Sequence, residues 1–291
     1  MDGSEQGVLN QVFEFTYPRV PSDTSTLDLK GGYLMHTEEE HQANSDSYRS
    51  HYPSVAVSTL VFTTKKDVLQ VALIKCPEYP HIDRWCLPCS YIRLEETADE
   101  AALRCLKDRT GITDVSIEQL YTFSDVARKP DLRIIMVSYI AMVPEWKLSH
   151  FKESTDLKAV LFDVIRTVDG FYLYSDSGIG EVRLEKSGLL FDHAQMIQTA
   201  LDRMAGKIDY SEIAFRFLNN TERFTLTELR YIYDAVKGAR SDVGNFRRFI
   251  KNRYIITGKV VNNADDRMEM EHAGRPASTF RYIENPAKET E

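Results

Sequence analysis

Residues 87–112 read LPCSYIRLEETADEAALRCLKDRTGI, and this stretch decides the fold of the chain. A helix is predicted from Thr97 to Thr110, because three small or apolar residues recur every fourth position on one face: Ala98, Ala102 and Leu106. Gly111 follows, and glycine commonly ends a helix in the left-handed conformation. The stretch therefore predicts a loop followed by one helix with an apolar inner face.

Strand-forming segments lie on both sides of this helix. Residues 55–62 and 68–74 are rich in β-branched and apolar residues, and the turn-like Lys65-Lys66-Asp67 between them predicts a hairpin. Residues 133–143 and 158–162 predict further strands. Mixed strands around a helix indicate an α/β sandwich.

The pattern changes to short helical units near residue 191. An amphipathic helix is predicted from Asp192, a plausible N-cap, to Ala205. Further helices and then two β-like segments follow, over residues 210–218, 227–237, 242–252, 254–261 and 278–283. Three helices and a two-stranded wing are the order of a winged helix-turn-helix.

The predicted helix over residues 242–252 has a polar outer face suited to DNA. Its inner stripe is apolar, whereas its outer faces carry amides and cations: Asn245, Arg247, Arg248, Lys251 and Asn252. Arginine pairs bidentately with guanine and asparagine with adenine, while lysine contacts phosphate. Arg275, in the predicted wing, is placed for phosphate or the minor groove. The alternative is a charged face that is merely solvated.

Net charge is unevenly distributed along the chain. The total is −8, yet residues 207–281 carry +4, which leaves −12 for the remainder. Because the C-terminal part is basic and the rest of the chain is acidic, we expect only the C-terminal part to contact the phosphates of a nucleic acid. The first 30 residues do not look like a secretory signal, and no apolar run is long enough to span a membrane. We therefore expect a cytoplasmic protein with no membrane partner.

The four cysteines, Cys76, Cys86, Cys89 and Cys105, fall within 30 residues. Disulfides are uncommon in the cytosol, and a single Cys-x-x-Cys pair is a weak metal signal. We expect reduced, partly buried thiols and no metal site.

Residues 87–112 also resemble the Nudix box, a phosphate-processing motif. The matching positions are Glu96, Arg104, Leu106, Gly111 and Ile112. In active Nudix enzymes three further glutamates share one helical face and gather Mg²⁺, which activates water. Those positions hold Cys105, Asp108 and Arg109 here, and Ser90 replaces the leading glycine. A thiol and a guanidinium are poor Mg²⁺ ligands. The expectation is a pseudoenzyme with no catalytic residues and no cofactor.

The chain from Thr37 to Ile283 is similar to the Nudix-related bacterial transcriptional regulators. The segments that carry the resemblance are the box and residues 37–44, 191–193, 224–229, 245–248 and 274–277. The resemblance implies a Nudix-like α/β/α sandwich followed by an all-α-plus-wing winged helix-turn-helix. It implies a homodimer on a palindromic operator in double-stranded DNA. It also implies a small-molecule effector, which is ADP-ribose or a related nucleotide in some members and a sugar or sugar phosphate in others.

Three arginines are candidates for effector binding: Arg128, Arg133 and Arg104. The segment 128–133 precedes a predicted strand, and its cations could line the cleft in which related Nudix enzymes bind their substrate. The nucleotide-responsive members often carry an Arg-Asp-Pro-Arg-like element, where this chain has Arg128-Lys-Pro-Asp131. That departure, with the insertion-like residues 172–188, leaves the effector open between nucleotides and sugars. A solvated basic turn is the alternative.

These observations predict five segments. They are an N-terminal extension (1–36), a Nudix-like sensing domain (37–190), a linker helix (191–206), a winged helix-turn-helix (207–283) and a tail (284–291). Two other functions remain open. One is an active Nudix hydrolase that uses Asp108, Glu95 or Glu96 and carries an appended interaction domain. The other is a scaffold whose basic helix meets an acidic partner.

Overall fold

The computed structural model describes residues 53–78, 80–129, 132–152, 159–176, 180–268 and 276–284. The predicted N-terminal extension, the helical stretch that begins at Thr37 and nearly all of the predicted tail lie outside these residues. So does Arg275.

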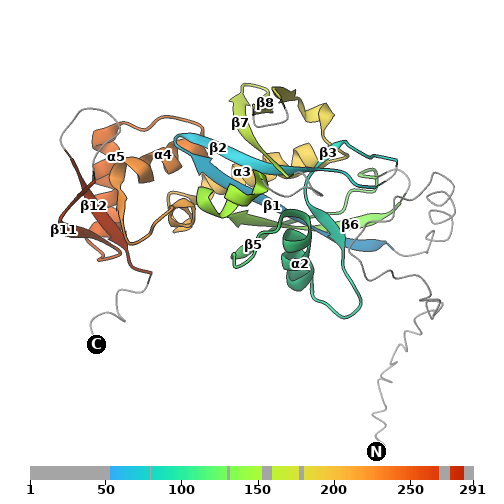
Figure 1. Cartoon of the computed structure of the whole chain (residues 1–291), viewed down its shortest axis with the longest axis horizontal. Helices are drawn as coiled ribbons and strands as arrows, with labels where there is room; N and C mark the ends of the chain where they lie inside the picture. The colour runs from blue at the N-terminus through green and yellow to red at the C-terminus, as the bar shows by residue number, and fades with distance from the viewer. Residues whose placement is uncertain are drawn as a thin grey trace, which may run out of the picture. The chain divides into compact units, whose positions relative to one another are not determined.

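The N-terminal part of the described chain is built on a mixed sheet (Figure 1). Its strands follow the order β5-β6-β1-β2-β7-β8-β9, and β3 and β4 pair with β2 and β1. Strand β1 is parallel to β6 and antiparallel to β2, and the β1–β2 turn confirms the predicted hairpin. The bounds are β1 (Ser54–Lys65), β2 (Val68–Lys75), β3 (Trp85–Cys86), β4 (Cys89–Tyr91), β5 (Ile117–Phe123), β6 (Ile134–Met142), β7 (Val160–Thr167), β8 (Gly170–Ser175) and β9 (Val182–Leu184).

Strand β1 is buried on both faces because helices cover both sides of the sheet. Val57 and Val61 pack with residues of α2 (Ala98–Thr110). Leu60 and Phe62 belong to the larger core that contains the inner face of α3 (His193–Lys207). This alternation follows from the two-residue period of a strand. It gives the α/β sandwich that the sequence predicts.

Helix α2 has the ends that its sequence indicates. Thr97 and Glu100 form a capping box, in which each side chain satisfies a backbone N–H of the first turn. Gly111 ends the helix with φ of 72°. Its inner face carries the fully buried Ala102, Cys105 and Leu106.

The C-terminal part is a winged helix-turn-helix with its own sheet. It contains α4 (Leu226–Lys237), α5 (Val243–Ile250), a π-helical turn (Lys251–Ile255) and the three strands β10 (Phe224–Thr225), β11 (Val260–Met268) and β12 (Ala277–Tyr282). The buried Asp234 fixes the turn between α4 and α5, since its carboxylate accepts from the Ser241 N–H at 2.8 Å and from Arg230 at 3.0 Å. Tyr233 packs edge-to-face on Phe246, which holds α5 against α4.

Several predicted boundaries were wrong. Residues 210–218 form only a short 3-10 helix (Ile213–Phe217), whose residues are buried nearly all round rather than on one stripe. The strand predicted from Tyr254 begins at Val260, because Tyr254 packs on Phe215 within the π-helical turn. The wing sheet also gains β10, which pairs with β12. The strand predicted over 158–162 starts at Val160 and continues to Thr167.

Residues 172–188, predicted as an insertion, add β8 and β9 to the edge of the sheet, followed by a short 3-10 helix (Lys186–Gly188). Another 3-10 helix spans Glu145–Lys152. No helix in the described part of the chain is long and apolar enough to cross a membrane.

The end of α4 is held against the sheet by Arg166 of β7. Its guanidinium donates to the Val236 carbonyl at 2.6 Å, and carbonyls in the last turn of a helix otherwise lack partners. Gly238 ends α4 with φ of 67°, and a Cβ there would lie 2.2 Å from the Arg166 Cδ. Glycine is therefore required at position 238 for two reasons: the backbone is in the left-handed region, and Arg166 leaves no room for a Cβ atom.

We expect Gly238→Ala to lower the free energy of unfolding by about 1–2 kcal/mol or more, because alanine is strained in the left-handed region and must displace Arg166. Gly206→Ala in α3 is the matched control. A Cβ at Gly206 meets nothing within 4 Å, so alanine should stabilise the helix by about 0.5–1 kcal/mol. Urea unfolding of the full chain measures both. Equal stability of the two variants would contradict the proposed role of the close approach.

Candidate functional site

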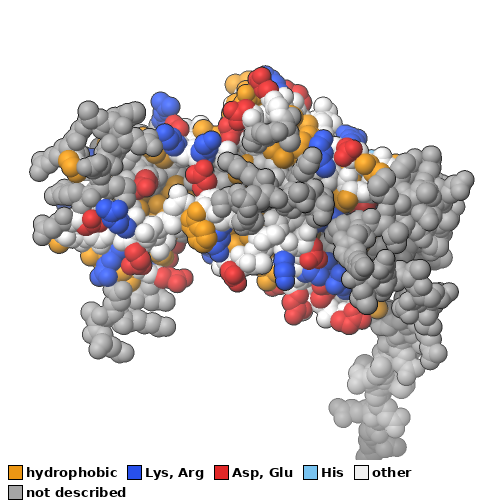
Figure 2. Space-filling model, viewed as in Figure 1, with side chains coloured by type: hydrophobic (Ala, Val, Ile, Leu, Met, Phe, Trp, Pro, Cys, Tyr) orange, Lys and Arg blue, Asp and Glu red, His pale blue; other side chains and the backbone are white. Residues whose placement is uncertain are grey.

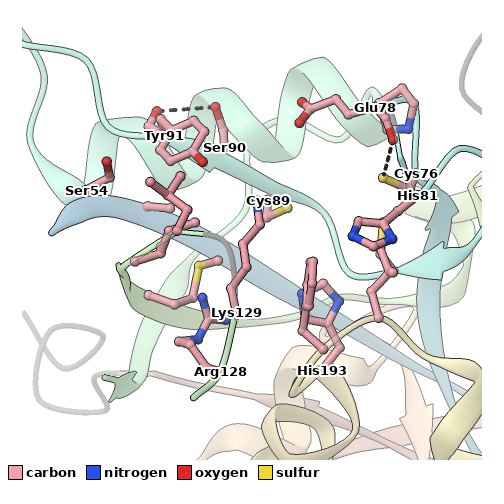
Figure 3. Close-up of a pocket in the computed structure, with 18 of the residues that line it drawn as sticks. Ser54, Cys76, Glu78, His81, Cys89, Ser90, Tyr91, Arg128, Lys129 and His193 are labelled. Atoms are coloured by element: carbon pink, nitrogen blue, oxygen red, sulfur yellow. Dashed lines mark hydrogen bonds between the residues drawn. The ribbon is translucent and has the colours of Figure 1, made fainter. Parts of the chain in front are cut away.

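A cavity of about 660 Å³ opens between the start of β1, the loop after β2, the end of α2 and the start of α3 (Figure 3). This volume is in the range of sites for small molecules and cofactors. The wall is largely apolar, with contributions from Val55, Ile74, Leu132, Met136 and Leu190. Polar groups therefore stand out, and their placement indicates what the cavity can hold.

The charged groups that line the cavity are mainly cationic. They are Arg109, Arg128 and Lys129, against the single lining carboxylate of Glu78 among the described residues. Arg109 lies 3.5 Å from Glu78, whose side chain is 62% exposed, so solvent weakens that pair. Lys129 lies 5.6 Å from the Phe191 ring, within cation–π range. Figure 3 shows Arg128 and Lys129 on one side of the cavity and Cys76 and His81 on the other. The arrangement suits an anionic ligand.

Arg128, a predicted effector residue, lines the cavity but is already engaged. Its guanidinium meets both carboxylate oxygens of Asp192 at 2.9 and 2.7 Å, and its side chain is 3% exposed. Asp192 precedes α3, but its side chain makes no capping hydrogen bond. Asp192 therefore occupies the predicted N-cap position, but its carboxylate pairs with a buried cation and does not cap the helix.

The other two predicted effector arginines do not line the cavity. Arg133 spans its own loop and donates to the carbonyls of Ser124 and Asp125 at 2.9 and 3.0 Å. Arg104 forms a two-point ion pair with Glu96, at 2.8 and 2.6 Å. Arg104 also binds Ser90 and the Tyr91 carbonyl, and so it supports two residues of the wall.

The pair also decides the state of Glu96, an alternative catalytic carboxylate. The Arg104 guanidinium lowers the pKa of Glu96 to about 2, and the Arg93 N–H adds to this effect. Glu96 is therefore an ionised structural partner at neutral pH. It is outside the cavity lining.

The three box positions of α2 face three different environments. Cys105 is fully buried in the core beside Val57 and Tyr139. Asp108 is exposed and lies 3.7 Å from Arg104. Arg109 alone lines the cavity. Among the described residues no group of three or more His, Cys, Asp or Glu side chains could hold a metal ion. A cation thus stands where Mg²⁺-binding carboxylates would be expected, and this donor set does not fit Mg²⁺.

His193, the first residue of α3, is a buried neutral imidazole in the cavity wall. Its Nδ1 accepts from the Leu87 N–H at 3.1 Å. Burial lowers its pKa to about 4, the nearby Asp192 carboxylate offsets part of this effect, and Arg128 adds to it to a smaller extent. Next to it, Phe191 has φ of 46° and stacks edge-on against His81 at 4.9 Å. The start of α3 is therefore part of the cavity.

Sequence reasoning assigned no role to His193, Lys129 or Arg109 in ligand binding. Arg109 carried a signal, since it replaces a box glutamate. Lys129 lies inside the basic segment that was singled out. His193 lies in the segment 191–193 that carries the family resemblance, but its contact with the distant Leu87 N–H has no local sequence signal.

The predicted DNA-binding residues that the structure describes are all exposed on one helical segment. Asn245, Arg247, Arg248, Lys251 and Asn252 extend from α5 into the π-helical turn, while Phe246 and Ile250 are buried. Asp242 caps α5 by accepting from the Asn245 N–H at 2.9 Å. On the face seen in Figure 2, Lys and Arg side chains alternate with acids, so no surface of one sign covers that view. The basic character is local to the helix.

The neutral state of His193 predicts a specific loss of stability in acid. Its folded-state pKa of about 4 lies below the usual 6.5, so the unfolded state takes up the proton first as pH falls below 6.5. Between pH 7.5 and pH 5 this uptake should cost about 2 kcal/mol of unfolding free energy. His193→Asn keeps an acceptor near the Leu87 N–H but cannot titrate, so its loss over this interval should be smaller by that amount. Urea unfolding at both pH values tests this, and an identical pH dependence in both proteins would refute it.

Comparison with known proteins agrees with this architecture. Residues 215–282 match the NrtR DNA-binding winged helix domain. A protein of Acinetobacter baylyi named ADPR responsive transcriptional repressor NtrR is 28% identical over 239 residues, which are 80% of this chain and 84% of that protein.

Solved structures share the fold over most of the chain. A MutT/nudix family protein from Enterococcus faecalis has a TM-score of 0.62 at 23% identity, over 85% of this chain and 94% of that one. Shewanella oneidensis NrtR in complex with a 27mer DNA has a TM-score of 0.59 at 22% identity, over 79% and 93%. The predicted fold class is thereby confirmed. The chain joins a Nudix-fold domain to a C-terminal segment that matches the NrtR DNA-binding winged helix domain.

Proposed function

We propose that this protein is a bacterial transcriptional regulator whose Nudix domain binds an anionic effector and whose winged helix binds operator DNA. The observation that carries the proposal is the exposed basic face of α5 within the segment that matches the NrtR DNA-binding domain. A second copy of the chain would place two such helices on a palindromic operator, as in other symmetric regulators. Such a protein works in the cytoplasm.

The cavity supports an effector with phosphate or carboxylate groups. Arg109, Arg128 and Lys129 supply positive charge in a mainly apolar site. The relative from Acinetobacter baylyi is named as responsive to ADPR, which makes ADP-ribose the first ligand to test. ADP-ribose carries a diphosphate for the cations and a flat adenine for the apolar wall. A sugar phosphate is the second candidate, since it would use the same cations with a smaller apolar contact.

We propose that the cavity binds its effector without hydrolysing it. The alternative, an active hydrolase, needs carboxylates around Mg²⁺. Asp108, Glu95 and Glu96 are all outside the cavity lining, and Glu96 is held by Arg104. Arg109 occupies the cavity in their place, and its charge repels a metal ion.

The first test of this function is effector binding without metal. ADP-ribose should bind the full chain in EDTA, measured by calorimetry. Lys129→Ala should weaken it about tenfold, which corresponds to about 1.4 kcal/mol and to one lost charged contact. Lys65→Ala, which removes an exposed lysine from the β1–β2 hairpin, is the charge-matched control. With Mg²⁺ or Mn²⁺ the bound ADP-ribose should remain intact.

Two results would oppose this assignment. Equal affinity of Lys129→Ala and wild type would place the anion elsewhere. Steady turnover that Asp108→Asn abolishes would establish the hydrolase instead. Arg128→Ala is a poor probe, because it leaves Asp192 buried without its partner.

The second test concerns DNA. On a duplex selected from a random pool, Lys251→Ala should weaken binding to all sequences and reduce the slope of log K against log salt by roughly 0.9 per contact. Arg247→Ala and Arg248→Ala should cost about 1–3 kcal/mol on the selected duplex and less on scrambled DNA. Fluorescence anisotropy over a salt series measures both effects.

Arg183→Ala is the control for net charge, because Arg183 is an exposed arginine of the Nudix sheet. It should bind DNA as the wild type does. If the three α5 variants fold and also bind as the wild type does, the helix is not a recognition helix. A scaffold for an acidic protein partner would then be the better reading.

A further inference from the structure

Three of the four cysteines line the proposed effector cavity. These are Cys76, Cys86 and Cys89, and all are free thiols. The binding of an anion through Arg109, Arg128 and Lys129 does not require thiols. Their concentration at one cavity is therefore a feature that the proposed function leaves unused.

Cys86 lies in β3, and Cys76 directly follows the neighbouring strand β2. In the β2–β3 ladder Ile74 pairs with Cys86, and the Cys76 N–H donates to the Arg84 carbonyl at 2.8 Å. The two cysteines are thus diagonal neighbours on the same face of the ladder. Both side chains line the same cavity, where the Cys76 thiol donates to the Glu78 carbonyl at 3.6 Å (Figure 3).

The two thiols differ in reactivity. The neighbouring Cys86 thiol, helped by the Glu78 backbone and by Arg109, lowers the pKa of Cys76 to about 7, whereas the Cys76 thiol and burial raise the pKa of Cys86. Burial raises the pKa of Cys89 to about 11. Cys76 is partly exposed and Cys86 is buried. Cys76 has the properties of an attacking thiolate, and Cys86 those of a resolving thiol.

We propose that Cys76 and Cys86 form a hydroperoxide-reactive thiol pair in the wall of the effector cavity. The Cys76 thiolate attacks the peroxide, the O–O bond breaks, and Cys76 becomes a sulfenic acid as hydroxide or alkoxide leaves. Cys86 then attacks the Cys76 sulfur, the S–O bond breaks, and water leaves as the disulfide forms. The peroxide takes up the two electrons, and an external dithiol restores both thiols.

The disulfide would reshape the cavity, a consequence that rests on the proposed function. Cys76 begins the loop that carries Glu78 and His81, and its backbone carbonyl accepts from the Asp83 N–H at 3.0 Å. Drawing Cys76 towards Cys86 pulls on this loop. His81 packs on Phe191 at the start of α3, so the pull reaches the same residues that line the cavity. Oxidation should therefore change effector affinity.

The decisive experiment identifies the bond itself. The full chain is treated with stoichiometric hydrogen peroxide, alkylated and digested without reductant. Mass spectrometry should show a Cys76–Cys86 crosslinked peptide that a dithiol removes. Cys86→Ala should instead leave a sulfenic acid at Cys76, trapped by dimedone. Cys89→Ser, in the same cavity, is the matched control and should still form the crosslink.

A kinetic readout tests the mechanism independently. At pH 7 iodoacetamide should modify Cys76 about fivefold faster in the wild type than in Cys86→Ala, because greater ionisation outweighs the lower intrinsic nucleophilicity. Equal modification rates in the wild type and Cys86→Ala would contradict the proposed Cys76–Cys86 pair. A crosslink that involves Cys89 instead of Cys86 would contradict it as well.

The link to the effector is measured last, as ADP-ribose affinity of the reduced and crosslinked protein. A several-fold difference supports the coupling, and equal affinity overturns it. If ADP-ribose binds neither form, the proposed effector fails, while the crosslink stands on its own mass signature.

Discussion

The buried ion pair between Arg128 and Asp192 is the interaction on which the cavity and the start of α3 both depend. The two side chains are 3% and 13% exposed, and they meet through two hydrogen bonds. Removing a charge from water costs several kcal/mol unless it is paired, so neither group is tolerated alone at this position. The pair joins the loop after β5 to the residue before α3. One residue further on, His193 is fixed by the Leu87 N–H. Cavity wall and first helical turn therefore form one unit.

Helix α3 connects this part of the cavity wall to the winged helix through a shared apolar core. Its inner face is fully buried from Met196 to Met204, in the same apolar core that contains Leu229 and Phe246. Arg203 donates to the Leu120 carbonyl, and Lys207 pairs with Glu118, so the helix is also tied to β5. A ligand can shift DNA affinity only through a difference in its affinity for two states. An anion at the cavity would supply such a difference, because it competes with Asp192 for Arg128. Packed helices respond to such changes by small rigid shifts, which suits a signal between domains.

The sequence predicted what local patterns determine. The β1–β2 hairpin, α2 with its terminal Gly111, and the helix predicted over residues 227–237 all follow from periodicity and turn chemistry, and the box resemblance indicated the fold. Features that depend on distant residues were missed. Tyr254 belongs to a region rich in β-branched residues, yet its contact with Phe215 keeps it in a helical turn. Aspartate is a residue type that commonly caps helices. The Asp192 carboxylate instead binds the buried guanidinium of Arg128, which lies 64 residues earlier in the chain. The same reason separates the predicted arginines: only Arg128 reaches the cavity, while Arg104 and Arg133 satisfy nearby carbonyls and carboxylates.

The position of Arg109 has a consequence for what a cavity of this kind can do. It lies in the last turn of α2, where a cation is favoured by the partial negative charge of the helix C-terminus. A guanidinium offers fixed donors that match phosphate oxygens, so it can neutralise a diphosphate as well as a metal ion does. It cannot bind water and lower its pKa, which is how Mg²⁺ and related ions generate a nucleophile. In the proposed function, exchanging carboxylates for this arginine would separate binding from turnover. For a regulator such a separation would be an advantage, because occupancy would then report the concentration of a ligand that the sensor does not consume.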